Sequence, residues 1–178
     1  MERVPPAQGL AGGTGRGHCP CYAHAPFAAP ASPPMTLTPF HVAVQVRDID
    51  EARRFYGGLL GCREGRSAHD WVDFDMYGHQ FVCHLNARLG AAGRLDAHVN
   101  MVDGAGVPVP HCGVVLEPLE WQALAERLQQ HEQIEWVIEP CVRFANSPAE
   151  QRTMFIRDPS GNALEFKSFQ NLALLFAK

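Results

Sequence analysis

The chain has 178 residues, of which 46% are hydrophobic and 19% charged, and its formal net charge is −4 at pH 7. This composition is typical of a globular domain and excludes a collagen-like, coiled-coil or wholly disordered chain. No apolar run reaches the roughly 18 residues that a membrane span needs, and no cluster of lysine and arginine offers a surface for nucleic acid. We therefore expect a soluble protein whose ligand is a small molecule, with neither membrane nor nucleic acid as a partner.

The six cysteines bear on the cellular compartment. The sequence shows no secretory signal, and several cysteines stand in apolar runs, where a thiol behaves as a small hydrophobic group. We expect free thiols and a cytoplasmic location. The cysteines in apolar runs are Cys62, Cys83, Cys112 and Cys141.

Residues 1–34 differ in composition from the rest, because 7 prolines, 5 glycines and 7 alanines fall among them. Such a segment buries too little apolar surface to offset its loss of conformational entropy. We expect a disordered tail, and Met35 as an alternative start that would leave the tail outside the native protein. Residues 35–178 are expected to form one domain with a single core.

Two segments seventy positions apart share a pattern. Residues 41–46 and 111–116 each alternate like a short strand and begin with a histidine. A helix is expected after each one. In the first, Asp48 caps the start and Gly61 ends it; in the second, Pro118 suits the first turn. The apolar stripe of the second helix is expected to comprise Leu119, Leu124 and Leu128.

Further strands are expected after each helix, with residues 86–110 connecting the two copies. The pattern predicts an α+β fold of two modules, about residues 36–86 and 107–169, each with a strand, a helix and two or three more strands. A tight turn is expected at 158–162. The expected later strands are 71–77, 79–85, 136–144, 151–157 and 163–167.

His41 and His111 occupy equivalent positions in the two copies, so a pseudo-twofold arrangement would let them converge. Glu165 lies in an apolar strand, where an unpaired carboxylate would be costly. Two imidazoles and one carboxylate are the facial set that holds a divalent metal and leaves coordination positions open. Each residue alone also suits a structural role, but the matched placement of the histidines favours a metal site.

At this point the chain resembles the vicinal oxygen chelate superfamily, which includes glyoxalase I, bleomycin-resistance proteins and extradiol dioxygenases. The resemblance covers about residues 36–169. It rests on the paired histidine-initiated segments, the Phe55-Tyr56…Leu60-Gly61 helix end and the Asp158-Pro159-Ser160-Gly161-Asn162…Glu165 hairpin. It implies two βαβββ modules that form a cupped mixed sheet around a central metal or ligand cleft. It also places the family's metal ligands on His41, His111 and Glu165.

The resemblance raises the question of a fourth ligand. Glyoxalase I members carry a carboxylate on the last strand of the first module, and counting from the turn glycine puts Val82 at that position. Valine cannot bind a metal. Gln80 and His84 share the strand face of Val82, so His84 is a candidate fourth ligand, with a structural or substrate-binding role as the alternative.

A site with three protein ligands favours iron(II) and an oxidoreductase, specifically a dioxygenase that acts on a small molecule chelated through vicinal oxygens. Tyr77, His69 and Arg143 are candidate acid–base residues that equally suit structural roles. Zinc, nickel and manganese remain alternative metals. A glyoxalase-type lyase or isomerase and a metal-free drug-binding protein remain alternative functions, and the sequence is compatible with a homodimer.

Overall fold

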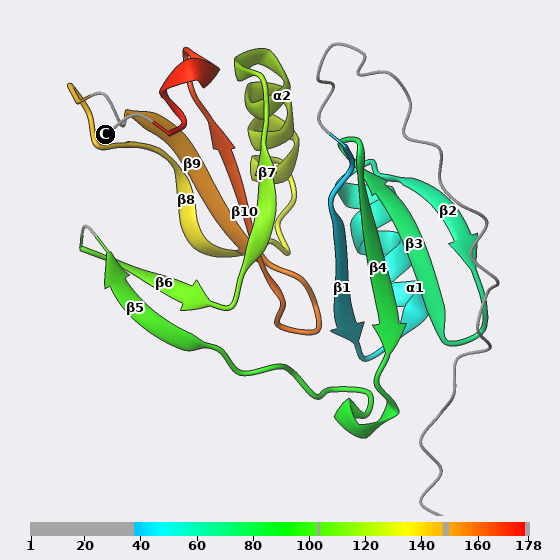
Figure 1. Ribbon diagram of the computed structural model, residues 1–178. Coiled ribbons are helices and arrows are strands. Elements are labelled where there is room, and N and C mark those ends of the chain that lie inside the picture. Colours follow the sequence, from blue (N-terminus) through cyan, green and yellow to red (C-terminus); the bar gives the residue numbers. More distant parts are fainter. Residues whose placement is uncertain (1–37, 103, 148–149, 177–178) are drawn as a thin grey trace, which may run out of the picture. The chain divides into compact units, whose positions relative to one another are not determined.

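The computed structural model describes residues 38–102, 104–147 and 150–176 (Figure 1). The expected tail, residues 1–34, and the alternative start at Met35 lie outside these ranges. In the described ranges no helix is long and apolar enough to cross a membrane.

The first module forms a four-stranded sheet with the strand order β1-β4-β3-β2. β1 runs parallel to β4, whereas the other neighbours are antiparallel. Its elements are β1 (His41–Val46), α1 (Ile49–Ala52), which continues as the wider helix η1 (Arg53–Leu59), β2 (Arg63–Ser67), β3 (Trp71–Met76), β4 (His79–Leu85) and the short η2 (Ala87–Leu89).

The second module repeats this topology, with the strand order β7-β10-β9-β8 and β7 parallel to β10. The predicted α+β fold of two βαβββ modules is therefore confirmed. Its elements are β7 (Cys112–Val115), α2 (Pro118–Gln129), β8 (Glu135–Arg143), β9 (Gln151–Arg157) and β10 (Ala163–Ser168), followed by the short η3 (Leu172–Leu174).

The connection between the modules contains a hairpin that the sequence reading left out. β5 (His98–Val102) pairs with β6 (Ala105–Val109) in an antiparallel ribbon of their own. Every residue of β5 is exposed. Its sequence alternates over only a few residues, and neither face of the strand is buried, so the pattern is a weak strand signal.

The helices follow the predicted capping signals. Asp48 accepts a hydrogen bond from the Glu51 amide at 2.6 Å and so caps α1. Near the end, the amide of Leu60 bonds to the carbonyl of Phe55, five residues back, and Gly61 ends the helix with a φ of 75°. One expected core position of α2 is wrong: Leu119 is 86% exposed.

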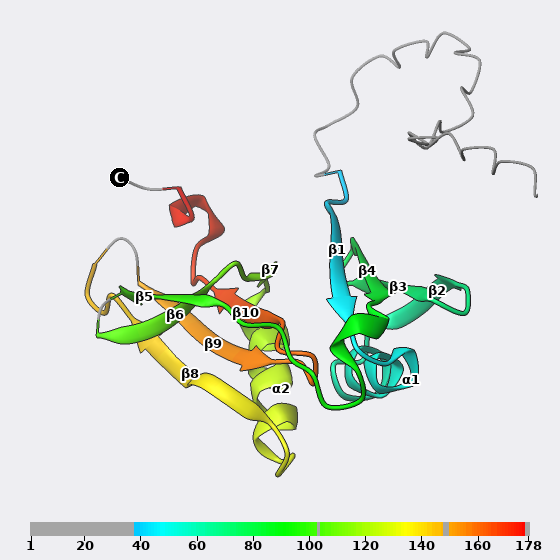
Figure 2. The same ribbon diagram turned by 90° about the horizontal axis from the view of Figure 1, so that it is seen from below.

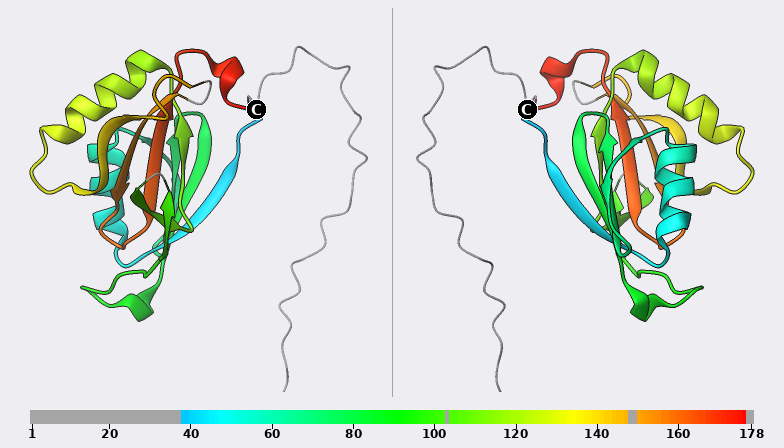
Figure 3. Two further views of the ribbon diagram at one scale, coloured as in Figure 1. Left: turned by 90° about the vertical axis from the view of Figure 1, so that its left-hand side faces the viewer. Right: turned by 90° about the vertical axis from the view of Figure 1, so that its right-hand side faces the viewer.

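Each helix covers one face of its own sheet (Figures 2 and 3). In the first module, Tyr56 stacks against Phe74 and Phe81, with ring centroids 5.5 and 4.9 Å away. In the second, Trp121 donates from its indole nitrogen to the carbonyl of Phe166 at 2.9 Å. Since strand side chains alternate between faces, the residues on either side of these aromatic groups point away from the helices.

The predicted turn at 158–162 joins the two modules. Tyr56 donates from its hydroxyl to Asp158 at 2.8 Å, and Asn162 donates from its amide to the carbonyl of Gln45 at 2.8 Å. The amide of Arg47 donates to the Ser160 hydroxyl at 3.0 Å. The turn therefore packs on both the first helix and the end of β1.

Candidate metal centre

Glu165 and its counterparts on β4 lie on the strand faces turned away from the helices. Phe166 of β10 packs on α2, so its neighbour Glu165 points to the opposite face. In the first module, Phe81 packs under Tyr56, so Gln80 and Val82 point to the opposite face.

His111 and Glu165 lie together. His111 precedes β7, and its Nε2 is 3.5 Å from Oε2 of Glu165. The Glu165 side chain is buried, and its other oxygen accepts a 2.8 Å hydrogen bond from the Thr153 hydroxyl. Lys167 places its ammonium 3.1 Å from Oε2 of Glu165. The second module therefore supplies two of the three predicted ligands as one pair.

A hydrogen bond sets the tautomer of His111. Nδ1 lies 2.6 Å from the carbonyl oxygen of Pro108, which only accepts, so Nδ1 carries the hydrogen. In the neutral ring the lone pair is then on Nε2, which faces an oxygen of Glu165. Two electron-pair donors side by side fit a bound cation, and metal-binding histidines commonly donate their second nitrogen in this way.

His41 lies on β1 of the other sheet and is exposed. Its Nδ1 is 2.9 Å from Oε1 of Gln80, its partner on β4. In the described parts of the chain, no three His, Cys, Asp or Glu side chains lie close enough together to hold a metal ion. The structure thus brings together His111 and Glu165 but does not group His41 with them.

The strand register shows why the two modules differ. Glu165 is the Cα partner of Gly113, two residues after His111. The residue two positions after His41 is Ala43, and its partner on β4 is Val82. Val82 therefore occupies the position of Glu165 in the repeat, as the count from the turn glycine predicts, and the first module offers no ligand there.

His84 lies further along β4. Its partner on β1 is Gln45, four residues beyond His41, which corresponds to about 13 Å along the strand. The side chain that contacts His41 is Gln80. The register therefore does not place His84 beside the first candidate ligand.

Tyr77 occupies the β3–β4 turn with a φ of 52°, and its ring meets Phe166 edge-on at 6.3 Å. That contact puts Tyr77 on the helix side of β10, opposite to Glu165. Burial raises the pKa of Tyr77 to about 12. Its hydroxyl reaches the carbonyl of Leu60 at 3.5 Å. This environment favours a structural role for Tyr77.

The other two acid–base candidates lie elsewhere. His69 is exposed between β2 and β3 and pairs with Asp70 at 3.6 Å. Arg143 is buried at the end of β8, where it donates to the carbonyl of Val102 at 2.6 Å and its guanidinium lies over the ring of Phe144. Arg143 therefore ties β8 to the β5–β6 hairpin.

Sequence reasoning missed Asp73. It is buried on β3 opposite Val82, and it accepts a 3.0 Å hydrogen bond from the side-chain amide of Gln80. The signal was present in the sequence, because a two-residue turn at Tyr77 and Gly78 pairs Met76 with His79 and so fixes this register.

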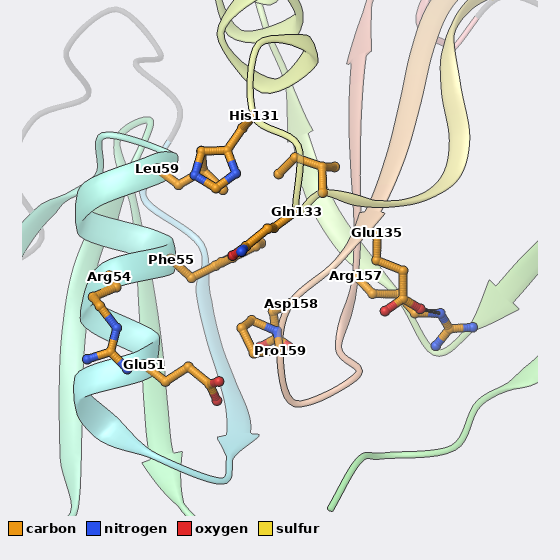
Figure 4. A pocket seen from close by; sticks show the side chains of 11 residues that line it. Glu51, Arg54, Phe55, Leu59, His131, Gln133, Glu135, Arg157, Asp158 and Pro159 are labelled. Carbon is orange, nitrogen blue, oxygen red and sulfur yellow. Dashed lines mark ion pairs between the residues drawn. The ribbon is translucent and has the colours of Figure 1, made fainter. Parts of the chain in front are cut away.

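Two cavities of similar size adjoin the sheets. One, of about 430 Å³, reaches His111 and is otherwise lined by β1, by 95–97 and by the start of β10. The other, of about 440 Å³, lies between α1–η1 and the segment after α2 (Figure 4). Two of its carboxylates are paired: Glu51 with Arg47 at 2.7 Å, and Glu135 with Arg157 at 3.6 Å. The first cavity is the one that adjoins a candidate ligand.

Comparisons with known proteins agree with the fold described above. A family model described as the Glyoxalase/Bleomycin resistance protein/Dioxygenase superfamily matches residues 38–166. A search of curated proteins by sequence finds no match.

Solved structures show the same fold. A glyoxalase/bleomycin resistance protein/dioxygenase from Alicyclobacillus acidocaldarius is 32% identical, with a TM-score of 0.63 over 78% of this chain and 96% of that chain. A glyoxalase/dioxygenase from Nostoc punctiforme is 19% identical, with a TM-score of 0.55 over 79% and 100% of the two chains. The fosfomycin resistance protein FosX from Listeria monocytogenes is 14% identical, with a TM-score of 0.54 over 79% and 98%. The latter two share the fold alone.

Proposed function

The chain belongs to the glyoxalase/bleomycin resistance protein/dioxygenase superfamily, and on that premise we propose that it is a metal-dependent enzyme whose ligands are His41, His111 and Glu165. Its substrate is a small molecule that binds through two adjacent oxygens. We favour iron(II) and a dioxygenase reaction.

The number of ligands is the observation that supports this choice. Val82 occupies the position on β4 that corresponds to Glu165 on β10, which is where a fourth protein ligand would lie. Three protein ligands leave up to three positions of an octahedron, enough for two substrate oxygens and dioxygen. When bound, iron(II) supplies Lewis acidity toward the substrate oxygens and electrons for dioxygen activation.

The protein's own groups position the reactants. The Pro108 carbonyl keeps Nε2 of His111 free, and Thr153 holds one oxygen of Glu165 so that the other faces His111. Lys167 adds a positive charge beside Glu165. We propose that this ammonium attracts a substrate oxygen that carries negative charge.

A second copy of the chain completes the site in this proposal. One described chain groups only His111 and Glu165, whereas His41 is exposed on another sheet. Exposed apolar side chains lie near both parts of the proposed site. Phe40, next to His41, is 68% exposed, and Val115, on the strand that follows His111, is 37% exposed. A homodimer would cover these side chains and bring His41 of one copy to the pair in the other.

Oxygen consumption tests the reaction. The protein is loaded with Fe²⁺ under anaerobic conditions and then mixed with oxygen and a panel of catechols. We expect substrate-dependent oxygen uptake, which Glu165→Ala abolishes and His131→Ala leaves unchanged, because His131 belongs to the other cavity. If there is no uptake and methylglyoxal with a thiol turns over under Zn²⁺ or Ni²⁺, the protein is a lyase instead. Tight binding of a small molecule without either activity would identify a binding protein.

A further inference from the structure

A chain of hydrogen bonds links a buried carboxylate to His41. Oδ2 of Asp73 accepts from Nε2 of Gln80 at 3.0 Å, and Oε1 of Gln80 lies 2.9 Å from Nδ1 of His41. The three residues come from three neighbouring strands, β3, β4 and β1. These hydrogen bonds therefore cross the sheet from the buried side chain of Asp73 to the exposed side chain of His41.

The donor and acceptor roles in this series of hydrogen bonds follow from the buried carboxylate of Asp73. A carboxylate only accepts hydrogen bonds, so the amide of Gln80 must turn its nitrogen toward Asp73 and its oxygen toward His41. An amide oxygen also only accepts. Nδ1 of His41 must therefore donate, which leaves the lone pair of the neutral ring on Nε2. His111 has the same tautomer, set there by the Pro108 carbonyl.

Core packing alone does not explain why the carboxylate of Asp73 is buried. Asp73 is buried, with 8% of its side chain exposed, and Oδ1 has no hydrogen-bond partner in the described structure. A Cβ atom at Gly65 on β2 would overlap Oδ1, so the absence of a side chain at Gly65 admits the carboxylate. The nearest cation, Arg66, lies 3.6 Å from Oδ2 and is largely exposed. Burying a partly unpaired carboxylate costs stability, so its retention calls for a role beyond packing.

We propose that Asp73 is a positioning residue of the metal site, which acts through Gln80 to hold His41 with Nδ1 protonated and Nε2 free to bind the metal. The metal-binding part of this inference rests on the proposed function. Gln80 is then an orienting group rather than a ligand. Histidine ligands are commonly held by such partners, whose loss weakens metal binding by about 10–100-fold.

The tautomer of His41 tests this proposal without any metal. Nitrogen-15 NMR of the metal-free protein near pH 8 distinguishes the two tautomers, and the His41 signal is assigned by its loss in His41→Ala. In the unmodified chain we expect the form with hydrogen on Nδ1. Asp73→Leu should shift His41 toward the form with hydrogen on Nε2, which an imidazole free in water prefers. His111 should not change.

Two further variants distinguish a specific effect on His41 from a general loss of folding. Gly65→Ala keeps Asp73 but displaces its carboxylate. His41 should therefore shift toward the tautomer with hydrogen on Nε2, as in Asp73→Leu. Asp73→Asn keeps the size of the side chain but can donate as well as accept, so it no longer fixes the orientation of Gln80 and should give a mixture of the two His41 tautomers. The matched control is Asp75→Asn on the same strand and face, because the Asp75 side chain contacts the Gly78 amide and Arg63 instead.

Zn²⁺ titration provides the second measurement. We expect Asp73→Leu and Gly65→Ala to bind Zn²⁺ about 10–100-fold more weakly, Asp73→Asn to lie between them and the unmodified chain, and Asp75→Asn to bind as the unmodified chain does. An unchanged His41 tautomer together with unchanged Zn²⁺ affinity in Asp73→Leu and Gly65→Ala would overturn the proposal while leaving the metal site standing. An unmodified chain that binds no metal at all would instead refute the proposed function, and with it the metal-binding part of this inference.

Discussion

At the scale of single residues, the two halves of the repeat have diverged at one decisive position. Glu165 and Val82 occupy the same register position in the two sheets. The second module therefore holds a histidine and a carboxylate, whereas the first holds a histidine whose orientation depends on Gln80 and Asp73. This asymmetry gives three ligands in our proposal.

Replacing the carboxylate ligand should remove the metal. Glu165→Ala deletes the only oxygen ligand and leaves Lys167 beside His111, so we expect metal affinity to fall by at least about 100-fold. Metal content after dialysis, measured by mass spectrometry, checks this. His131→Ala is the control and should retain metal; equal retention in both variants would contradict the assignment of Glu165.

The free thiols should differ in reactivity. Burial raises the pKa of Cys62 to about 12 and that of Cys112 to about 11, whereas Cys141 is exposed. Burial also raises the pKa of Cys141. Because the thiolate is the reactive form, alkylation at pH 8 should be slower for Cys112 than for Cys141, and about 10-fold slower again for Cys62. For Cys112 the rate should rise steeply as the pH approaches 11. Peptide mapping by mass spectrometry measures each rate, and equal rates at pH 8 would contradict the described burial.

The repeat made His41, His111 and Glu165 visible in the sequence, because each is distinguished by its place within a strand pattern. Asp73 was missed because its role depends on which residue lies opposite it, and the reading did not carry the two-residue turn through to the strand register. The tautomers were also beyond the sequence, since Pro108 meets His111 through its backbone carbonyl.

At the scale of elements, the turn between β9 and β10 connects the modules through buried hydrogen bonds. Tyr56 is fully buried and donates to Asp158, whose pKa burial raises despite the hydrogen bonds from Asn162 and Tyr56. The polar side chains of the Asp158-Pro159-Ser160-Gly161-Asn162 turn thus satisfy partners on the first module.

Removing the Tyr56 hydroxyl should weaken this connection. Tyr56→Phe leaves a buried carboxylate oxygen of Asp158 without one of its donors, so we expect the free energy of unfolding to fall by about 1–3 kcal/mol. Urea denaturation measures the change. Tyr77→Phe is the comparison variant, because its part-buried hydroxyl meets the Leu60 carbonyl at 3.5 Å and Arg127 rather than a buried carboxylate, and its effect should be the smaller of the two. Equal losses in the two variants would contradict this role of Tyr56.

Strands in which apolar residues alternate or form a short run were predicted to within a residue, as in β1, β3, β4 and β9. β2 and β5 were not predicted. Both are exposed along their whole length; β2 has no alternation, and the alternation of β5 spans only a few residues. In α2, Leu119 matched the stripe in the sequence but lies in the first turn, and Trp121 supplies the buried contact instead.

At the scale of the whole molecule, the described fold accounts for the family match over residues 38–166. The composition of residues 1–34 leads us to expect that a chain starting at Met35 has the same melting temperature as the full chain, because a segment so rich in proline and glycine buries little apolar surface. Differential scanning calorimetry of the two chains checks this. A drop of several degrees, or loss of bound metal, would contradict it.

In the proposed site, His41 of one copy joins His111 and Glu165 of another around one metal. The most direct test is the metal content of His41→Ala and Glu165→Ala, expressed separately and together. Separately, neither variant should retain metal. Together, half of the dimers combine the two variants and each of these has one intact site, so about one quarter of the unmodified metal content should return. If the mixture holds no more metal than the separate variants, or if either variant alone keeps its metal, this arrangement of the site is wrong.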